Sequence, residues 1–239
     1  MGLPYKYTNP HSPRMPFGSA ESDPTAANDD MAPADTKATF MRIPWIARKI
    51  NQPGTVCRVS NSRTPKPDGE DSLWAEILKT PRTIRSTISF YKKPENDDDP
   101  VPEVTTVLTI GNGMNGHPDT IHGGITATML DECMGICQSV NIERAHIAAV
   151  KRGKAFGELP PHEVTAFTRE LKVTYLLPVR TPGAIMVTTR RVKKEGRKEW
   201  LAGELKQCTG NGEDDDGEVV VCATGEALFL EPRPIKSKI

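Results

Sequence analysis

Hydrophobic positions change their spacing along this 239-residue chain, and the spacing predicts the order of its elements. β-branched and apolar residues predict strands over 84–92 and 104–110, whereas the apolar residues of 121–141 recur at helical spacing without a proline. The pattern therefore predicts the order β-β-α-β-β-β-β, with one long helix between strands. Four further strand-like segments, joined by turn-forming residues, follow the helix at 164–177, 184–194, 199–208 and 218–230.

The first 82 residues differ in composition from the rest of the chain. Residues 1–40 contain six prolines among Ser, Asn, Asp and Ala, which predicts a disordered or extended arm. Residues 41–82 combine apolar stretches at helical spacing with Pro/Gly/Asn-rich passages, so we expect short helices that form an N-terminal cap. The main domain then covers 83–231, and 232–239 form a C-terminal tail.

The predicted helix has two different faces. At 100° per residue, seven apolar residues fall within one arc of about 140° that faces the sheet: Ile125, Met129, Leu130, Cys133, Ile136, Cys137 and Val140. The opposite face consists mainly of small residues, so another group must approach closely there: Gly124, Ala127, Asp131, Gly135 and Gln138. Asp131 lies in the middle of this face, whereas Glu132 lies at the edge of the apolar arc and is the poorer candidate for chemistry.

The start of this helix is suited to binding a negatively charged oxygen. The helix begins at Gly123-Gly124, and a helix N-terminus offers unpaired N–H groups and a partial positive charge. Such an end can hold a developing oxyanion, and Asp131, about two turns further on, is a candidate base or nucleophile for a carbonyl carbon held there. That combination is acyl-transfer chemistry. Spacing alone leaves an alternative open, in which the glycines permit close packing and Asp131 is a solvated carboxylate.

Charge and composition exclude several classes of protein. The 31 Lys and Arg residues balance the 31 Asp and Glu residues, so no net charge draws the chain toward nucleic acid. No apolar run approaches the roughly 18 residues that span a bilayer, so we expect no membrane partner. Five cysteines without a CxxC pair, and no N-terminal signal-peptide pattern, predict a reducing compartment and no secretion.

Metal binding is not predicted either. Cys133 and Cys137 lie at i, i+4 on the apolar arc, where small-residue packing is the ordinary explanation, and no His stands at a suitable ligand spacing. The acidic runs 97–99 and 213–216 fall in predicted connections without the spacing of a calcium loop. We therefore expect neither a metal nor a cofactor.

The ten residues from His122 to Asp131, His-Gly-Gly-Ile-Thr-Ala-Thr-Met-Leu-Asp, resemble the signature of hotdog-fold thioesterases. The similarity is to the branch that includes phenylacetyl-CoA thioesterases, and it covers roughly 83–230. It implies an α+β hotdog fold, in which an antiparallel sheet of about six strands wraps around one long central helix. The preceding cap is similar to that of fungal members of the superfamily.

The resemblance also implies an activity and roles for individual residues. The reaction would be hydrolysis of an acyl thioester at sites on the interface of a homodimer. Gly123 would donate its N–H to the thioester carbonyl, Asp131 would activate water or attack directly, and His122 would orient the loop. Thr168 would position the lytic water. A purely structural role remains open for His122 and for Thr168.

Further residues are candidates for substrate binding. Gly124 and Thr128 belong to the signature itself. Relatives often carry an Asn six residues before the His; this chain has Gly116 there, and the nearest Asn is Asn115. The long passage after the helix carries a basic cluster that either meets coenzyme A phosphates or an acidic carrier protein, or is simply solvated: Lys151, Arg152 and Lys154.

The predicted partners follow from this reading. The substrate would be an acyl-CoA or a carrier-protein-bound acyl or polyketide thioester. An exposed strand edge and the small-residue helix face predict a homodimer or a dimer of dimers. Two other functions stay open: a non-catalytic acyl-CoA-binding module, and a hotdog dehydratase or hydratase, which uses a different His/Asp arrangement.

The last three residues resemble a short targeting signal. Ser237-Lys238-Ile239 resembles the Ser-Lys-Leu peroxisomal signal with one aliphatic residue exchanged for another. A Lys-rich end also meets so short a pattern by chance. We therefore expect a cytoplasmic or peroxisomal protein.

Overall fold

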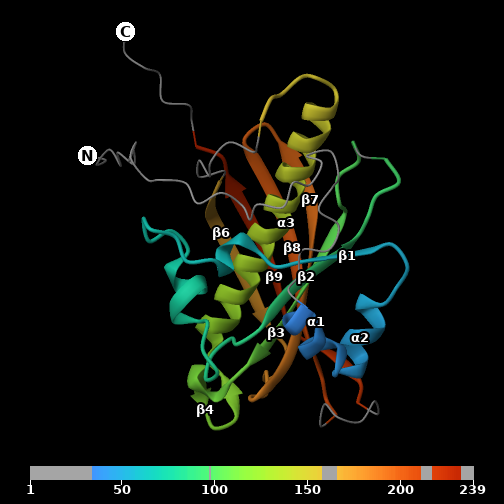
Figure 1. The fold of residues 1–239 in the computed structure, drawn as a ribbon. Helices are drawn as coiled ribbons and strands as arrows, with labels where there is room; N and C mark the ends of the chain where they lie inside the picture. Colours follow the sequence, from blue (N-terminus) through green and yellow to red (C-terminus); the bar gives the residue numbers. More distant parts are fainter. Residues whose placement is uncertain (1–33, 97, 158–165, 211–216, 233–239) are drawn as a thin grey trace, which may run out of the picture.

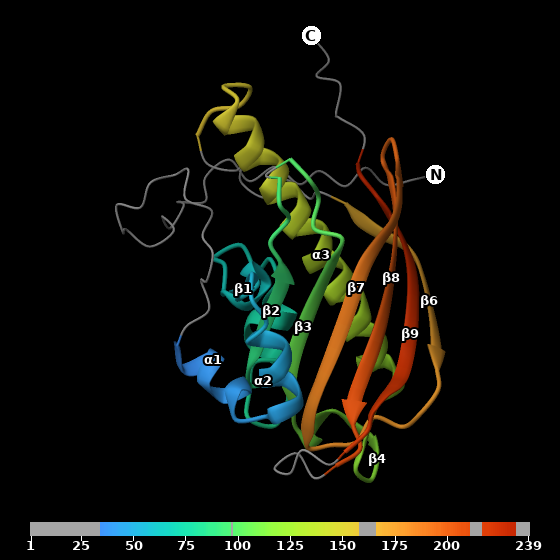
Figure 2. The same ribbon diagram turned by 90° about the vertical axis from the view of Figure 1, so that its right-hand side faces the viewer.

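A computed structural model describes most of the chain, and Figures 1 and 2 show its fold. The predicted arm and tail lie almost entirely outside the described residues, as does the tripeptide Ser237-Lys238-Ile239. The described residues are 34–96, 98–157, 166–210 and 217–232.

One antiparallel sheet of seven strands wraps around the long helix α3, as the views from two sides show (Figures 1 and 2). The strand order is β1-β2-β3-β7-β8-β9-β6, so the strand that follows the helix forms one edge of the sheet. This α+β arrangement is the hotdog fold, as predicted. The strands are β1 (Thr55–Arg58), β2 (Thr87–Lys92), β3 (Glu103–Ile110), β6 (Phe167–Tyr175), β7 (Gly183–Glu195), β8 (Lys198–Cys208) and β9 (Val219–Leu230).

The seventh strand comes from the segment expected to form a cap. β1 pairs antiparallel with β2, with Val56 opposite Tyr91, and so extends the expected set of about six strands by one. Its four residues lie directly after a turn at Gly54, which has a φ of 72°. A segment this short carries too few positions for alternation to be recognised, so only pairing with β2 reveals it. β4 (Asn115–His117) and β5 (Thr120–Ile121) pair antiparallel and form a second sheet of two strands.

The cap also contains the expected short helices. α1 (Ala34–Met41) and α2 (Pro44–Ile50) cover the sheet face opposite α3, where Phe40 and Ile46 pack on Ile88 of β2. The short turns η1 (Asn61–Arg63) and η2 (Leu73–Ile77) lie closer to α3. Because side chains of successive strand residues point to opposite faces, the sheet has an apolar core on each side.

The central helix is longer than its apolar pattern indicates. α3 spans Gly123–Lys151, 29 residues, and continues ten residues beyond the predicted end at Asn141. Nothing in 142–150 breaks a helix, whereas Gly153 follows with a φ of 67°. The N–H of Gly153 donates to Val150 O at 2.9 Å, a typical glycine-dependent helix end.

Two glycines let the helix approach the sheet closely. Gly203 of β8 and Gly225 of β9 lie directly opposite each other. A Cβ on Gly225 would lie 2.9 Å from Cε of Met134, and one on Gly203 would lie 3.2 Å from the same atom. A larger residue at either position would therefore require the end of the Met134 side chain to move.

The two predicted faces of α3 are largely as expected. Six of the seven residues of the apolar arc are buried, and Ile125 is partly buried against the same core. On the small-residue face, a Cβ added to Gly135 would have no neighbour within 4 Å, so that face is open in the single chain. Gln138 is the exception, because it is buried and its Nε2 donates to Glu199 Oε2 of β8 at 2.6 Å.

Candidate functional site

The start of α3 is capped by the side chain of His122. Its backbone is extended (φ −66°, ψ 134°), and its Nδ1 accepts the N–H of Gly124 at 3.0 Å. The ring therefore satisfies one of the unpaired N–H groups of the helix end. The N–H of Gly123 has no acceptor among the described residues, so it is the group that the helix end presents to a ligand.

Gly116 lies close to the ring of His122. A Cβ at Gly116 would lie 3.0 Å from Cδ2 of the His122 ring. A larger residue at this position would therefore require the His122 ring to shift by a few tenths of an ångström. Asn115 faces elsewhere: its Oδ1 accepts from the hydroxyl of Thr181 at 2.5 Å and so ties β4 to the loop before β7.

Tyr175, which the sequence did not single out, lies against Gly123. Its hydroxyl donates to Gly123 O at 2.9 Å, and its ring would lie 3.5 Å from a Cβ on that glycine. The side chain is 56% exposed. The end of edge strand β6 therefore lies beside the start of the helix. The position of Tyr175 in the sequence, at the end of a predicted strand, does not indicate this contact with Gly123.

Asp131 and Thr168 meet as the resemblance implied. The hydroxyl of Thr168, near the start of β6, donates to Asp131 Oδ1 at 2.8 Å. Burial raises the pKa of Asp131, and the hydrogen bond from Thr168 opposes this rise. A bulge between Thr168 and Glu170 bends the strand at this point. The pair is thus a half-buried carboxylate with an oriented hydroxyl on the open face of α3.

The two halves of the predicted site are separated along the helix. Gly123 and Asp131 are eight residues apart, which corresponds to about 12 Å along the axis. A carbonyl oxygen hydrogen-bonded to Gly123 lies about 3 Å from its nitrogen. The two groups therefore do not contact each other within one chain, and their joint action on one carbonyl stays a prediction.

Glu132 lies on a different side of the helix from Asp131. Its Oε1 accepts the hydroxyl of Ser62 in η1, so it joins the cap to the central helix. Burial raises the pKa of Glu132 to about 7, with smaller upward contributions from the charges of Asp71 and Asp131 and a downward one from Arg63. The sequence gave no indication of this buried contact.

This environment predicts a pH-dependent stability. Because the folded-state pKa of Glu132 is raised from 4.5 to about 7, its stabilising effect is complete below pH 4.5 and is lost as the pH rises through 7. Between pH 5 and pH 8 this group should lower the free energy of unfolding of the wild-type protein by about 2 to 3 kcal/mol. The Glu132→Gln variant should lack this part of the fall. Urea denaturation at the two pH values measures this, with the exposed Glu76→Gln as control. An unchanged fall in the Glu132 variant would contradict the assignment.

The remaining candidates lie apart from Asp131. Thr128 donates to Gly124 O at 2.9 Å within the helix, and Gly124 itself is exposed. The basic cluster is exposed at the other end of α3, where the helix places it about 30 Å from Asp131. Arg152 pairs there with Asp98 at 2.7 Å. Within one chain the basic cluster therefore does not contact Asp131. Its members are Lys151, Arg152 and Lys154.

The described residues contain neither a cluster of metal ligands nor a membrane-spanning helix. Across the described residues, no group of three or more His, Cys, Asp or Glu side chains is placed to hold a metal ion. Burial raises the pKa of Cys137 to about 11 and that of Cys133 further, so both thiols stay protonated. In the same part of the chain no helix is both long and apolar enough to cross a membrane.

Comparison with known proteins supports the thioesterase resemblance. Residues 119–198 match the family model of the Thioesterase superfamily. An uncharacterized protein of Schizosaccharomyces pombe is 30% identical over 119 residues, 49% of this chain and 53% of that protein. An uncharacterized mitochondrial membrane protein of Saccharomyces cerevisiae is 22% identical over 166 residues, 70% of this chain and 57% of that protein. The chain thus spans little more than half the length of these two relatives.

A solved structure is similar in outline. Zebra fish thioesterase superfamily member 2 is 15% identical and has a TM-score of 0.45, over 72% of this chain and 91% of that one. The family match includes Gly123, Asp131 and Thr168, the three residues whose geometry is described above. Together with the observed hotdog fold, the match over residues 119–198 confirms the resemblance of this chain to the thioesterase superfamily.

Proposed function

We propose that this protein is an acyl thioesterase that hydrolyses the thioester of coenzyme A or of an acyl carrier protein. The observation that carries the proposal is the Asp131–Thr168 pair on the open face of the helix whose first N–H, that of Gly123, has no acceptor among the described residues. A base beside a water site and a donor for an oxyanion are the two elements that acyl transfer to water requires.

The proposed reaction uses Asp131 as a general base. Water held by the hydroxyl of Thr168 gives a proton to the Asp131 carboxylate and attacks the thioester carbon. Negative charge develops on the carbonyl oxygen and is stabilised by a Gly123 N–H. The carbon–sulfur bond then breaks, the acid is released, and the thiolate takes the proton from Asp131. Direct attack by the carboxylate, with an anhydride that water then opens, is the alternative for the first step.

A homodimer overcomes the distance between the two halves of the site. β6 is an edge of the sheet, and a two-fold axis through that edge pairs two copies of β6 antiparallel. The Thr168 end of one strand then lies beside the Tyr175 end of the other. Because Thr168 contacts Asp131 and Tyr175 contacts Gly123, this pairing brings Asp131 of one protomer toward Gly123 of the partner subunit.

Release of free thiol is the direct test of the proposed function. A panel of acyl-CoA and acyl-carrier-protein thioesters is incubated with the full chain, and a thiol reagent reports the product. We expect turnover with at least one thioester. Acyl-CoA binding without thiol release would instead indicate a non-catalytic module. Change at an acyl double bond without thiol release would indicate a hydratase or dehydratase.

The shared site predicts that two inactive variants restore each other. Gly123→Pro removes the N–H, and proline suits the first position of a helix when the preceding residue is extended, as His122 is. Alone it should lose about 100-fold in kcat. Mixed under subunit exchange with Asp131→Asn, it should form heterodimers in which one of the two sites is intact. Activity of the mixture, compared with each variant alone, is the measurement.

A matched variant separates the N–H from the side chain. Gly123→Ala keeps the N–H and adds a methyl group at ordinary contact distance, 3.5 Å, from the Tyr175 ring. It should retain most activity. A mixture that stays inactive, although size-exclusion chromatography shows exchanged dimers, would place both groups in one chain. An active monomer at assay concentration would also refute the shared site.

A further inference from the structure

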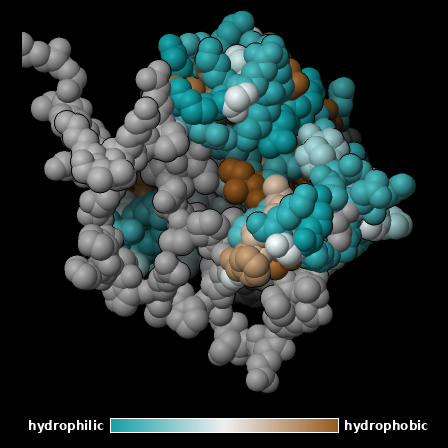
Figure 3. All heavy atoms as spheres, turned by 90° about the horizontal axis from the view of Figure 1, so that it is seen from above, coloured by the Kyte–Doolittle hydropathy of each residue, from teal (hydrophilic) through white to brown (hydrophobic). Residues whose placement is uncertain are grey.

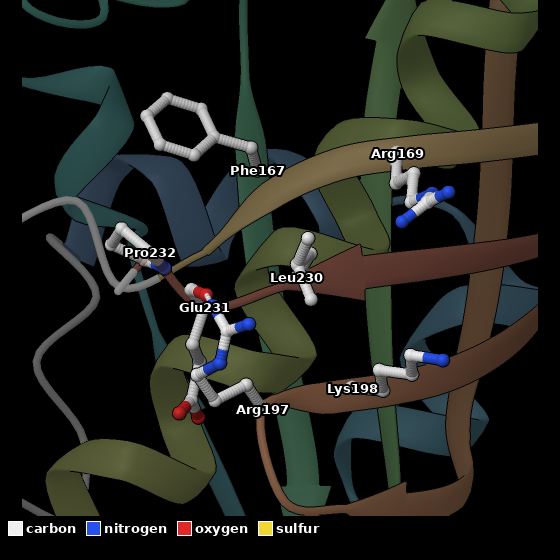
Figure 4. A pocket seen from close by; sticks show the side chains of 7 residues that line it. All are labelled: Phe167, Arg169, Arg197, Lys198, Leu230, Glu231 and Pro232. Carbon is white, nitrogen blue, oxygen red and sulfur yellow. Dashed lines mark hydrogen bonds between the residues drawn. The ribbon is translucent and has the colours of Figure 1, made fainter. Parts of the chain in front are cut away.

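A hollow on the outer face of the sheet lies close to the candidate base. Thr168 points toward Asp131, whereas its neighbours Phe167 and Arg169 line the hollow. The hollow has a volume of about 660 Å³, within the range of small-molecule sites. Figure 4 shows its lining side chains, which come from β6, from the start of β8 and from the end of β9: Phe167, Arg169, Arg197, Lys198, Leu230, Glu231 and Pro232.

The lining is positively charged although the chain is neutral. Three cationic side chains face one carboxylate, Glu231, and that carboxylate already pairs with Lys194 at 2.8 Å. Residues 190–199, at the hairpin end of β7 and β8, contain six Lys or Arg residues against two Glu. Of these, Arg191 points inward and pairs with the buried Glu199. The view from above in Figure 3 shows a mainly hydrophilic face among the described residues. Cations are therefore concentrated here, which favours an anionic ligand.

The backbone near the hollow holds one of these cations in place. Arg197 Nη1 donates to the carbonyl oxygen of Glu231 at 2.8 Å, which orients its guanidinium at one side of the hollow. Arg169 stands on the other side, with only a long contact of 3.6 Å to Glu170. Guanidinium groups bind phosphate oxygens in pairs, so two of them around a hollow suit a phosphate group.

The hollow also has an apolar part. Phe167 is 58% exposed, and Leu230 and Pro232 also line the hollow. An exposed phenylalanine ring offers a flat surface on which a planar base can stack. Phosphate-binding cations beside an aromatic surface, in a volume of this size, match a nucleotide.

We propose that this hollow binds a nucleoside phosphate, with its phosphates between Arg169, Arg197 and Lys198 and its base against Phe167. Two sources share this chemistry. One is the nucleotide part of a coenzyme A thioester, and this source rests on the proposed function. The other is a free nucleotide that occupies the hollow independently of the substrate.

Calorimetric titration of the full chain with ADP and with adenosine 3′,5′-bisphosphate tests the binding without any assay of activity. We expect saturable binding that Arg169→Gln weakens at least about tenfold, the effect of a lost charge-assisted hydrogen bond. Phe167→Ala should weaken it as well. Lys172→Gln is the matched control, because Lys172 lies on the same strand, is 77% exposed and does not line the hollow.

Each outcome decides the proposal. No saturable binding, or binding that the Arg169 and Lys172 variants weaken equally, would overturn it. Pyrophosphate binding as tightly as ADP, with no effect of Phe167→Ala, would show a general anion site and refute the nucleotide assignment.

Inhibition kinetics separate the two sources. The substrate source predicts that ADP raises KM for an acyl-CoA but not for a short acyl thioester without a nucleotide. A free nucleotide leaves both KM values unchanged. If no thioester is hydrolysed, the proposed function fails, whereas the titration still decides whether the hollow binds nucleotides.

Discussion

Asp131→Asn is expected to lower kcat at least about 100-fold, the lower end of a general-base contribution, while the protein stays folded. The amide keeps the shape of the side chain and can still accept the hydroxyl of Thr168, but it cannot take a proton from water. Burial raises the pKa of Asp131, which makes the carboxylate a stronger base than an exposed aspartate. Steady-state thiol release gives kcat, and circular dichroism reports the fold.

Glu132→Gln provides the matched control for this substitution. Glu132 is the adjacent carboxylate, but it accepts a hydrogen bond from Ser62 of the cap instead of facing Thr168. We expect its kcat to remain within a few-fold of the wild-type value. A large loss in the Glu132 variant combined with an active Asp131 variant would transfer the chemistry to Glu132.

Arg191→Met is expected to reduce the free energy of unfolding by about 3 kcal/mol, because it leaves a buried carboxylate without its cation. Glu199 is 1% exposed and accepts from Arg191 Nε at 2.5 Å and from Gln138 Nε2 at 2.6 Å. Methionine fills the space of the arginine stem, so the expected loss reports the charge and not a cavity. Denaturant unfolding at neutral pH measures it.

The neighbouring arginine is the control for this effect. Arg190 lies next along β7, points to the opposite face and is exposed. Arg190→Met should change stability by less than about 1 kcal/mol, as exposed charges usually do. Equal losses of unfolding free energy in the two variants would mean that the Arg191–Glu199 contact is not the cause of the destabilisation. Rescue of Arg191→Met by Glu199→Gln would support the buried-charge explanation.

Local sequence determined a large part of the fold and of the site. Helical spacing defines the buried face of α3, and strand-like segments match β2, β3 and β6 to β9 within a few residues. These features are local, because each depends on which side of one element is apolar. The resemblance also assigned both Asp131 and Thr168 to the site, and the structure brings the two into contact.

Contacts between distant segments were decided by the tertiary structure. Gln138 has the spacing of the open face, yet the curved sheet brings Glu199 over it. Glu132 has its buried environment only because the cap folds back onto the helix, and Tyr175 meets Gly123 only because β6 runs back along α3. The separation of Gly123 from Asp131 follows from helix geometry alone. The edge that the sheet leaves unpaired, β6, decides which surface can bring Gly123 of a second chain toward Asp131. Periodicity describes the faces of one element, whereas burial, pKa and site assembly depend on what lies opposite those faces.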